Sequence, residues 1–353
     1  MSAARQHGLP AVVAPRVGVP WTLVALTTLL GAVLVGLLVG PVPIGIGEIA
    51  RSALARVPFL SVATPLDAAQ EAIVWELRFP RVVLGALVGG MLALSGASYQ
   101  GVFRNPLADP YLLGVAAGAG FGATLVIAYG PAGVDGFVLP LASFAGAIAA
   151  VVAAYLIGRS VGGGRTTATL ILAGVTVAAF LTAAQVFVQQ QNSDTLNEVY
   201  AWLLGGLTTA GWGDVLTVLP YVALSAAVLL LHRRTLDVLA VGDEEARSLG
   251  LDVTRVRLLL VAAATLGTAA AVAVSGLIGF VGIVVPHLVR LVVSSSYRVI
   301  LPLSVIVGAA FLVLADVLAR TILAPAELPI GVVTAFIGAP FFALVLRTTR
   351  SSA

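Results

Sequence analysis

The chain carries charge so rarely that long uncharged stretches are its dominant feature. A bilayer core about 30 Å thick is crossed by about 20 apolar residues in a helix. Several uncharged stretches reach that length, so the chain is predicted to be an all-α, polytopic membrane protein. The stretches without Asp, Glu, Arg or His are 17–47, 82–103, 110–134, 136–158, 166–193, 215–231, 258–286, 299–315 and 328–346.

Composition excludes several classes of protein. Of 353 residues, 59% are hydrophobic and 10% are charged, whereas soluble domains carry about 25% charged residues. This excludes a soluble enzyme, a nucleic-acid-binding protein and a disordered scaffold. The chain has no cysteine, which rules out disulfides, thiolate nucleophiles and cysteine metal sites. All the basic residues are arginines, and they are scattered among the loops instead of forming a stripe.

The stretch 258–286 is too long for one helix. Its pattern predicts a helix ending near Ser275, a tight glycine turn, and a short helix from about Leu277 to Val293. This division makes ten spans, so both termini are expected on one side of the membrane. The residues that interrupt the stretch are Gly276, Gly279, Gly282 and Pro286.

Arginine distribution predicts the orientation, because cytoplasmic loops carry an excess of basic residues. A cytoplasmic N-terminus places fourteen arginines inside and only five outside, at 51, 56, 78, 81 and 320. The first span is followed by Pro41-Val-Pro43 and further spans, which is unlike a cleavable signal peptide. We therefore expect residues 1–353 to form one transmembrane domain of the cytoplasmic (inner) membrane, with both termini cytoplasmic and 1–19 as an N-terminal tail.

Three loops are long enough to carry function. Residues 41–80 and 189–213 are expected outside, the second with a short interfacial helix over Leu196–Leu203. Residues 232–257 are expected inside, with Asp243 capping a short acidic helix that Gly250 ends. Two short helices separated by a glycine would make a rigid projection for a groove on a partner. A solvated interfacial helix is the alternative.

Several short strings in the chain occur together in one family. They keep their order across residues 75–346, and the chain resembles the permeases of ATP-driven importers for iron–siderophore complexes, heme and cobalamin (FecCD or vitamin-B12-type permeases). The strings are Arg78-Phe-Pro-Arg81, Leu94-Ser-Gly-Ala97, Arg104-Asn-Pro-Leu-Ala-Asp-Pro110, Leu113-Gly-Val115, Leu172-Ala-Gly-Val175, Gly242-Asp-Glu-Glu-Ala-Arg-Ser-Leu-Gly250, Ser275-Gly-Leu-Ile-Gly-Phe-Val-Gly282, Pro286-His287, Asp316 with Arg320, and Glu327-Leu-Pro-Ile-Gly331.

The resemblance implies a type II ABC importer permease of about ten helices. Such a subunit forms a homodimer, or pairs with a paralogue, around a central path. Two cytoplasmic ATPase subunits drive it, and a periplasmic or lipid-anchored binding protein delivers the ligand. A P-loop needs a lysine, and the chain has none. We therefore expect no catalytic residues and no cofactor, with ATP hydrolysis on a separate subunit.

The resemblance also assigns roles to matching residues. Arg78, Arg81 and Arg320 are expected to dock carboxylates of the binding protein, although arginines at a rim can also reach lipid headgroups. Asp316 lies one helical turn before Arg320 and is expected to pair with it. The ATPase-coupling residues are Gly242, Asp243, Glu244, Glu245, Ala246, Arg247, Leu249 and Gly250. The cytoplasmic gate is Thr166, Thr167 and Ala168, and the periplasmic gate is Gln191, Asn192 and Ser193.

Two charged or polar residues near the inner side need separate interpretation. A single His287 without further ligands at suitable spacing favours a structural histidine over a heme or metal ligand. Arg290 is expected to extend to the cytoplasmic interface. The string Arg104–Pro110 is interpreted as a rigid turn, because Asn105 and Asp109 each precede a proline.

The sequence therefore predicts a permease that translocates an iron complex. A ferric siderophore is the first choice because that class is the most numerous, and heme or cobalamin is the alternative. An ion-coupled secondary transporter would need buried carboxylates near the membrane midplane, where only Asp316 comes close. A membrane enzyme would need a convergent set of groups, and the three histidines at 7, 232 and 287 are far apart in sequence.

Overall fold

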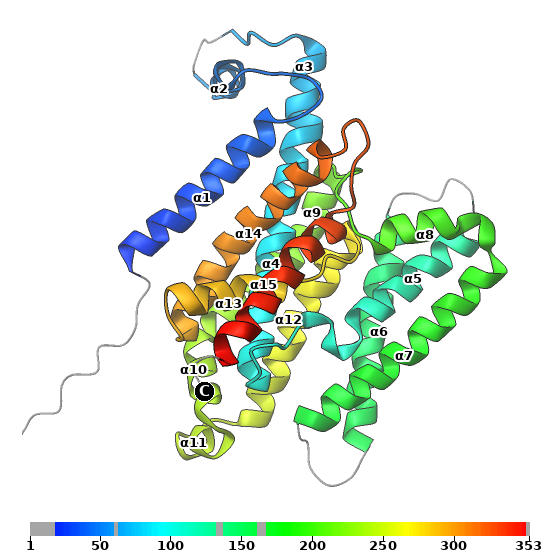
Figure 1. The fold of residues 1–353 in the computed structure, drawn as a ribbon, viewed down its shortest axis with the longest axis vertical. Coiled ribbons are helices and arrows are strands. Elements are labelled where there is room, and N and C mark those ends of the chain that lie inside the picture. Colours follow the sequence, from blue (N-terminus) through cyan, green and yellow to red (C-terminus); the bar gives the residue numbers. More distant parts are fainter. Residues whose placement is uncertain (1–17, 60–62, 132–136, 161–166, 351–353) are drawn as a thin grey trace, which may run out of the picture.

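The structure is a computed structural model that describes residues 18–59, 63–131, 137–160 and 167–350. Every regular element within these ranges is a helix, and they contain no strand. The long helices run between two ends of the molecule, and short helices cover those ends (Figure 1). The predicted all-α class is confirmed.

Each predicted span coincides with one helix of the structure. Among the described residues, seven helices are long and apolar enough to cross a membrane, and α5, α13 and α15 up to Val345 are shorter apolar helices. The count of ten spans stays a prediction. The helices are α1 (Val19–Leu38), α4 (Phe79–Phe103), α5 (Val115–Tyr129), α6 (Val138–Ser160), α7 (Thr167–Gln191), α9 (Trp212–Leu231), α12 (Val253–Ser275), α13 (Val281–Val292), α14 (Tyr297–Thr321) and α15 (Ile330–Arg350).

Short helices lie toward the two ends of the bundle (Figure 1). At the upper end of that view are α2 (Ile46–Ala55), α3 (Ala68–Ala72) and the π-helix η1 (Ile73–Arg78). At the lower end are α10 (Arg233–Val241) and α11 (Asp243–Ser248). The predicted interfacial helix is present as α8 (Leu196–Leu203), and single 3₁₀ turns form η2 (Pro110–Leu113) and η3 (Ser193–Thr195).

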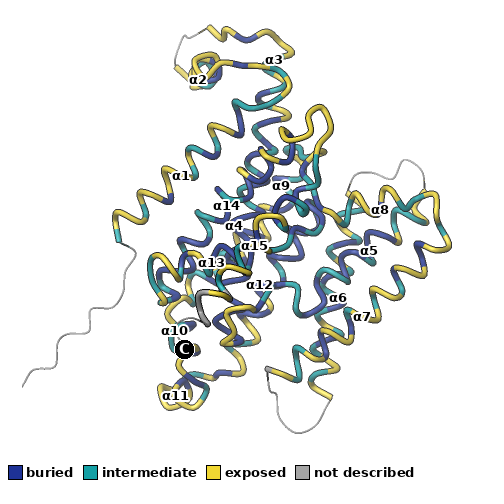
Figure 2. Tube along the Cα trace, in the orientation of Figure 1, coloured by how far each residue is buried: buried dark blue, intermediate teal, exposed yellow. Residues whose placement is uncertain are grey.

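Helix α4 is the centre of the bundle and is buried along most of its length (Figure 2). Glycines allow its neighbours to approach backbone to backbone, as small residues do in membrane proteins. A Cβ added to Gly89 would lie 2.3 Å from the Gly308 carbonyl oxygen of α14, and one added to Gly96 would lie 1.8 Å from that of Gly282 in α13. Two of the strings that carry the resemblance thus meet at the α4–α13 crossing.

The long uncharged stretch 258–286 is broken where the pattern predicted. Helix α12 ends at Ser275, but α13 begins at Val281, later than the predicted Leu277. The physical reason is that Gly276 and Phe280 both have positive φ angles, +65° and +68°, which interrupt helical hydrogen bonding. The Tyr111 hydroxyl holds this turn, because it donates to the Ile278 carbonyl (3.0 Å) and accepts from the Ile278 N–H (3.2 Å).

Candidate functional site

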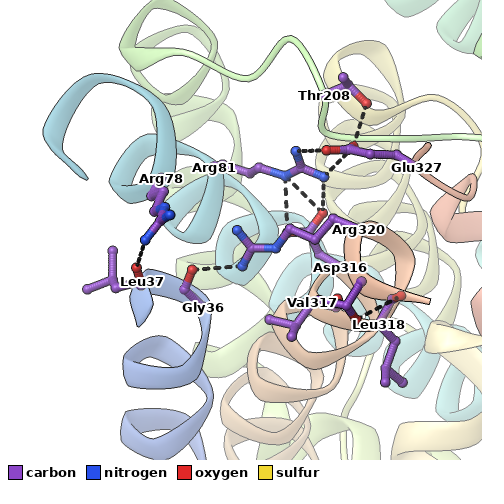
Figure 3. Close-up of polar contacts among 11 residues, drawn as sticks. Gly36, Leu37, Arg78, Arg81, Thr208, Asp316, Val317, Leu318, Arg320 and Glu327 are labelled. Atoms are coloured by element: carbon purple, nitrogen blue, oxygen red, sulfur yellow. Dashed lines mark hydrogen bonds and ion pairs between the residues drawn. The ribbon is translucent and has the colours of Figure 1, made fainter. Parts of the chain in front are cut away.

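The three arginines predicted at one rim lie close together at the end of the bundle that carries α2 and α3 (Figure 3). With Asp316 and Glu327 they form a connected set of polar side chains. We call this set the arginine junction; it consists of Arg78, Arg81, Asp316, Arg320 and Glu327.

A π-helical turn leads into α4 and positions two of these arginines. The Phe79 N–H donates to the Val74 carbonyl, five residues earlier. Pro80 follows at once, and a proline ring has no N–H and crowds the carbonyl four residues before it. A wider turn accommodates this crowding. Arg78 and Arg81 are consequently one helical turn apart at the start of α4.

Arg81 is held between two carboxylates from distant parts of the chain. Its Nε and Nη2 donate to Asp316 Oδ1 at 3.0 and 2.7 Å, and its Nη1 and Nη2 donate to the two oxygens of Glu327 at 3.0 and 2.8 Å. Glu327 also accepts from the Thr208 hydroxyl at 3.2 Å. A guanidinium fork suits such paired carboxylates. Arg81 therefore joins the start of α4, the end of α14 and the loop before α15.

Arg78 and Arg320 bind the C-terminal end of α1. Arg78 Nη1 donates to the Leu37 carbonyl at 2.8 Å, and Arg320 Nη2 donates to the Gly36 carbonyl at 2.7 Å. The last carbonyls of a helix lack partners within the helix and carry partial negative charge. Both guanidiniums are buried, so in this single chain they hold α1 against α4 and α14.

Asp316 has a different main partner from the one expected. Its oxygens accept from Arg81, whereas Arg320 Nε lies 3.6 Å from Asp316 Oδ2, an ion pair without a hydrogen bond. Glu327 is a member of the site that was not predicted, although it begins the string Glu327-Leu-Pro-Ile-Gly331. The hydrogen bond from Arg81 lowers the pKa of Glu327, so this carboxylate stays ionised near neutral pH.

The predicted coupling residues lie in α11 and directly beside it, at the opposite end of the molecule, where α10 and α11 make a compact two-helix projection (Figure 1). Gly242 separates the helices and occupies the N-cap, so the expectation that Asp243 caps α11 is wrong. The Asp243 carboxylate is instead drawn to Arg257 Nη2 at 2.9 Å and Arg104 Nη2 at 3.4 Å. Gly250 ends the helix as predicted, with a φ of +84° that favours glycine.

The projection is tied to the two central helices. Arg104 follows the last residue of α4, and Arg257 lies in the first turns of α12, so one carboxylate of α11 links both. Burial of Asp243 is the largest single influence and opposes its ionisation. The hydrogen bond from Arg257 and the positive charges of Arg257 and Arg104 together outweigh burial and lower the pKa of Asp243. Leu249 is 71% exposed at the end of the projection.

The gate residues lie toward the two ends of α7 (Figure 1). Thr166 is outside the described residues, Thr167 begins α7, and Ala168 is exposed in its first turn. At the other end Gln191 is the last helical residue, and the Asn192 side chain donates to the Val188 carbonyl at 2.9 Å. Ser193 begins η3. One chain does not bring these two groups together.

Arg290 makes polar contacts within the chain. Its Nη2 lies 3.1 Å from Gln100 Oε1 and 3.3 Å from the Tyr297 hydroxyl. Its extension to the cytoplasmic interface stays a prediction. His287 packs against the rings of Phe341 and Phe342, and the described residues contain no group of three or more potential metal ligands.

The loop 104–110 has the local hydrogen bonds of a rigid turn. Asn105 accepts from the Leu107 N–H at 2.9 Å, and Asp109 accepts from the Tyr111 N–H at 2.7 Å. These are the turn-forming side-chain contacts that Asn and Asp favour. Burial raises the pKa of Asp109 to about 6.

Comparisons with known proteins agree with this architecture. The model of the FecCD transport family matches residues 28–348. The cobalamin import system permease protein BtuC of Halobacterium salinarum is 42% identical over 93% of this chain and 96% of its own length. The Fe(3+)-citrate import system permease protein YfmD of Bacillus subtilis is 39% identical over 80% and 83%. A solved inward-facing structure, described as a metal-chelate type ABC transporter, superposes with a TM-score of 0.81 at 29% identity, covering 93% of this chain and 99% of that one.

Proposed function

The chain belongs to the FecCD transport family and is an ABC importer permease, not itself an enzyme, and from this premise we propose that it moves a ferric siderophore inward across the cytoplasmic membrane. The family match over residues 28–348 carries the transport function. The ferric-citrate relative and the metal-chelate transporter structure support an iron chelate as cargo. Cobalamin is the second candidate, because the cobalamin permease matches almost its entire length.

The path is proposed to run between two copies of the chain. Helix α7 leaves large apolar side chains uncovered in the single chain, with Leu172 67%, Phe180 71% and Phe187 65% exposed. Exposed apolar surface on a transmembrane helix faces either lipid or another helix. Pairing of α7 with its copy would place Thr166, Thr167 and Ala168 at one gate and Gln191, Asn192 and Ser193 at the other.

Separate ATPase subunits are proposed to drive the cycle through α10 and α11. The coupling residues are those from Gly242 to Gly250 named above. The contacts of Asp243 with Arg104 and Arg257 support this role, because a pull on α11 would reach α4 and α12 directly. With the ATPases on that side, the proposal keeps both chain termini cytoplasmic, as the arginine distribution predicts.

Docking of a substrate-binding protein is proposed at the arginine junction, through Arg78, Arg81 and Arg320. Arg81 is more available than Arg320, because its side chain is 12% exposed against 6% for Arg320, and its partner Glu327 is 32% exposed. A carboxylate of the binding protein could replace Glu327 on Arg81 at little cost in charge. The exchange would release the loop before α15 when, and only when, the binding protein is bound.

Reconstitution tests the proposed function. The chain is reconstituted in liposomes with its ATPase and binding protein. Uptake of ⁵⁵Fe-siderophore, hemin and cyanocobalamin is then measured with and without ATP on the side of the membrane that carries the ATPase. We expect ATP-dependent uptake of the ferric siderophore. ATP-dependent uptake of cyanocobalamin alone would establish the second candidate. Concentrative uptake by the chain alone, driven by an ion gradient, would contradict the whole proposal and favour a secondary transporter.

A further inference from the structure

A cavity of about 240 Å³ opens between α6 and α12, beside the end of α4 and the start of α7. Its walls are mostly apolar, with Phe103, Val151 and Val261 among the lining residues. It lies toward the end of the bundle that carries α11. Nothing in the proposed transport path or in the arginine junction uses this cavity.

The two arginines of the cavity lie at the end nearer α11, which we call its mouth. Arg159 lies in the last turn of α6, and Arg257 lies in the first turns of α12. Val151 and Val261 are deeper along the same helices, about 6–12 Å from the arginines at 1.5 Å rise per residue. The cavity therefore combines a positively charged mouth with an apolar interior that follows the direction of the spans.

These polar groups have unused hydrogen-bonding capacity. Arg159 is exposed and has no ion-pair partner within the described part of the chain. Arg257 uses Nη2 for Asp243, while its buried Nε has no hydrogen-bond partner. A buried donor without an acceptor is costly. A bound anion at the mouth would supply that acceptor.

We propose that this cavity binds one anionic phospholipid, with the phosphate between Arg159 and Arg257 and an acyl chain in the apolar interior. Guanidinium groups match phosphate oxygens in geometry and charge, and basic pockets between membrane helices suit anionic headgroups. A zwitterionic lipid would place its own cation beside two arginines. A soluble phosphate would leave the apolar interior empty.

The site has a consequence for transport, which rests on the proposed coupling role of α11. Arg257 contacts both the cavity and Asp243. Lipid bound at the mouth would orient the guanidinium toward the carboxylate of α11. Lipid binding itself does not depend on that role, so the two ideas can fail separately.

Native mass spectrometry of the full-length chain tests the site. The protein is released from detergent after incubation with equimolar dioleoylphosphatidylglycerol and dioleoylphosphatidylcholine. We expect one retained phosphatidylglycerol. Arg159→Gln is expected to weaken its binding about fivefold, the contribution of one basic residue near a membrane surface. Ala262→Phe, at an exposed position of the cavity wall, is expected to exclude the lipid by filling the space.

Matched control variants lie on α12 but outside the cavity. Arg255→Gln removes a side chain that is 89% exposed, and Leu259→Phe enlarges one that is 43% exposed; both should retain the lipid. Equal retention of phosphatidylcholine, or wild-type lipid binding by both Arg159→Gln and Ala262→Phe, would overturn the proposal. A change from dimer to monomer in Arg159→Gln and Ala262→Phe without loss of lipid would also overturn it. That result would assign the cavity to a contact between two copies of the chain.

Discussion

At the scale of single residues, each guanidinium of the arginine junction is compensated inside the chain. Arg81 is paired with two carboxylates, whereas Arg78 and Arg320 are directed at the carbonyls that end α1. A buried charge is tolerated only when it is paired and hydrogen-bonded. The two carboxylates differ in exposure, 2% for Asp316 and 32% for Glu327, so their removal should have different costs.

Asp316→Asn should destabilise the protein far more than Glu327→Gln. Loss of the buried carboxylate leaves Arg81 and Arg320 undercompensated, at a cost of about 3–5 kcal/mol. Loss of the partly exposed one should cost about 1 kcal/mol or less. Unfolding of both variants in mixed micelles measures the difference. Equal stability of the two would contradict the arrangement of charges around Arg81.

The buried carboxyl of Asp109 should make the stability of the fold depend on pH. Burial raises its pKa from 3.8 to about 6, so the folded state favours the protonated form. The contribution of Asp109 to the free energy of unfolding is fully present below pH 3.8 and is lost as the pH rises through 6. Asp109→Asn keeps the acceptor for the Tyr111 N–H and should gain about 1–2 kcal/mol over wild type at pH 7, but nothing at pH 3.5. Melting temperatures across this range measure it; a constant difference would contradict it.

At the scale of elements, the close crossing of α4 and α13 organises the bundle. Membrane helices associate by packing and hydrogen bonding, because lipid removes the hydrophobic drive between them. The contact of Gly96 with the Gly282 backbone permits that packing. The turn that Tyr111 holds comes directly before α13. Displacement of the α4–α13 crossing would therefore also disturb the connection between α12 and α13.

Gly96→Ala should therefore destabilise the bundle. The added methyl would overlap the Gly282 carbonyl, and overpacking of a filled core costs about 1–3 kcal/mol. Gly31→Ala is the matched control, since it lies within span α1 and a Cβ there meets nothing within 4 Å. The melting temperature and the monodisperse yield in detergent should fall for the first variant only. A normal melting temperature for Gly96→Ala would show that α13 can shift without cost.

At the scale of the whole molecule, the two surfaces proposed for docking and coupling lie at opposite ends and share helices. Arg81 lies in the first turn of α4 at the arginine junction, and Arg104 follows the last residue of α4 beside α11. Helix α4 therefore reaches from the proposed docking surface to the proposed coupling surface. An importer needs such a connection, because binding-protein release and ATP hydrolysis occur on opposite sides of the membrane.

The triple variant of Asp243, Glu244 and Arg247 to alanine should still insert and dimerise but lose ATP-coupled uptake. The change removes both the link to Arg104 and Arg257 and the charged face of α11. Uptake in vesicles with the assembled transporter measures coupling, and Arg255→Ala, an exposed residue beyond the projection, serves as control. Unchanged uptake by the triple variant would remove the coupling role.

Docking should depend on the competition at Arg81. Glu327→Gln should tighten binding-protein association about two- to tenfold at low salt, because it frees a charged donor, and Arg81→Gln should weaken it. The advantage should shrink as salt screens the pair. Kd measurements at two ionic strengths test this, with Arg51→Gln on α2 as control. If neither variant alters Kd at low salt, the junction is structural and docking lies elsewhere.

Much of the fold could be predicted because its determinants are local. An uncharged run of about 20 residues specifies a span whatever its neighbours are, and glycine at Gly250 or Gly276 ends a helix by its own backbone preference. The short helix Leu196–Leu203 and the break after Ser275 were predicted for the same reason. The start of α13 was not, because Phe280 adopts a positive φ that only packing around the turn imposes.

The sequence alone determined the class of protein, the position of the spans and the family. Only the tertiary structure decided which groups neutralise the arginines, because Arg81 and Asp316 are separated by 235 residues along the chain. It likewise added Glu327 to the junction, paired Arg290 with Gln100 and brought Arg159 and Arg257 to one cavity. Hydropathy acts along the chain, whereas ion pairs and cavities depend on which helix ends converge in space.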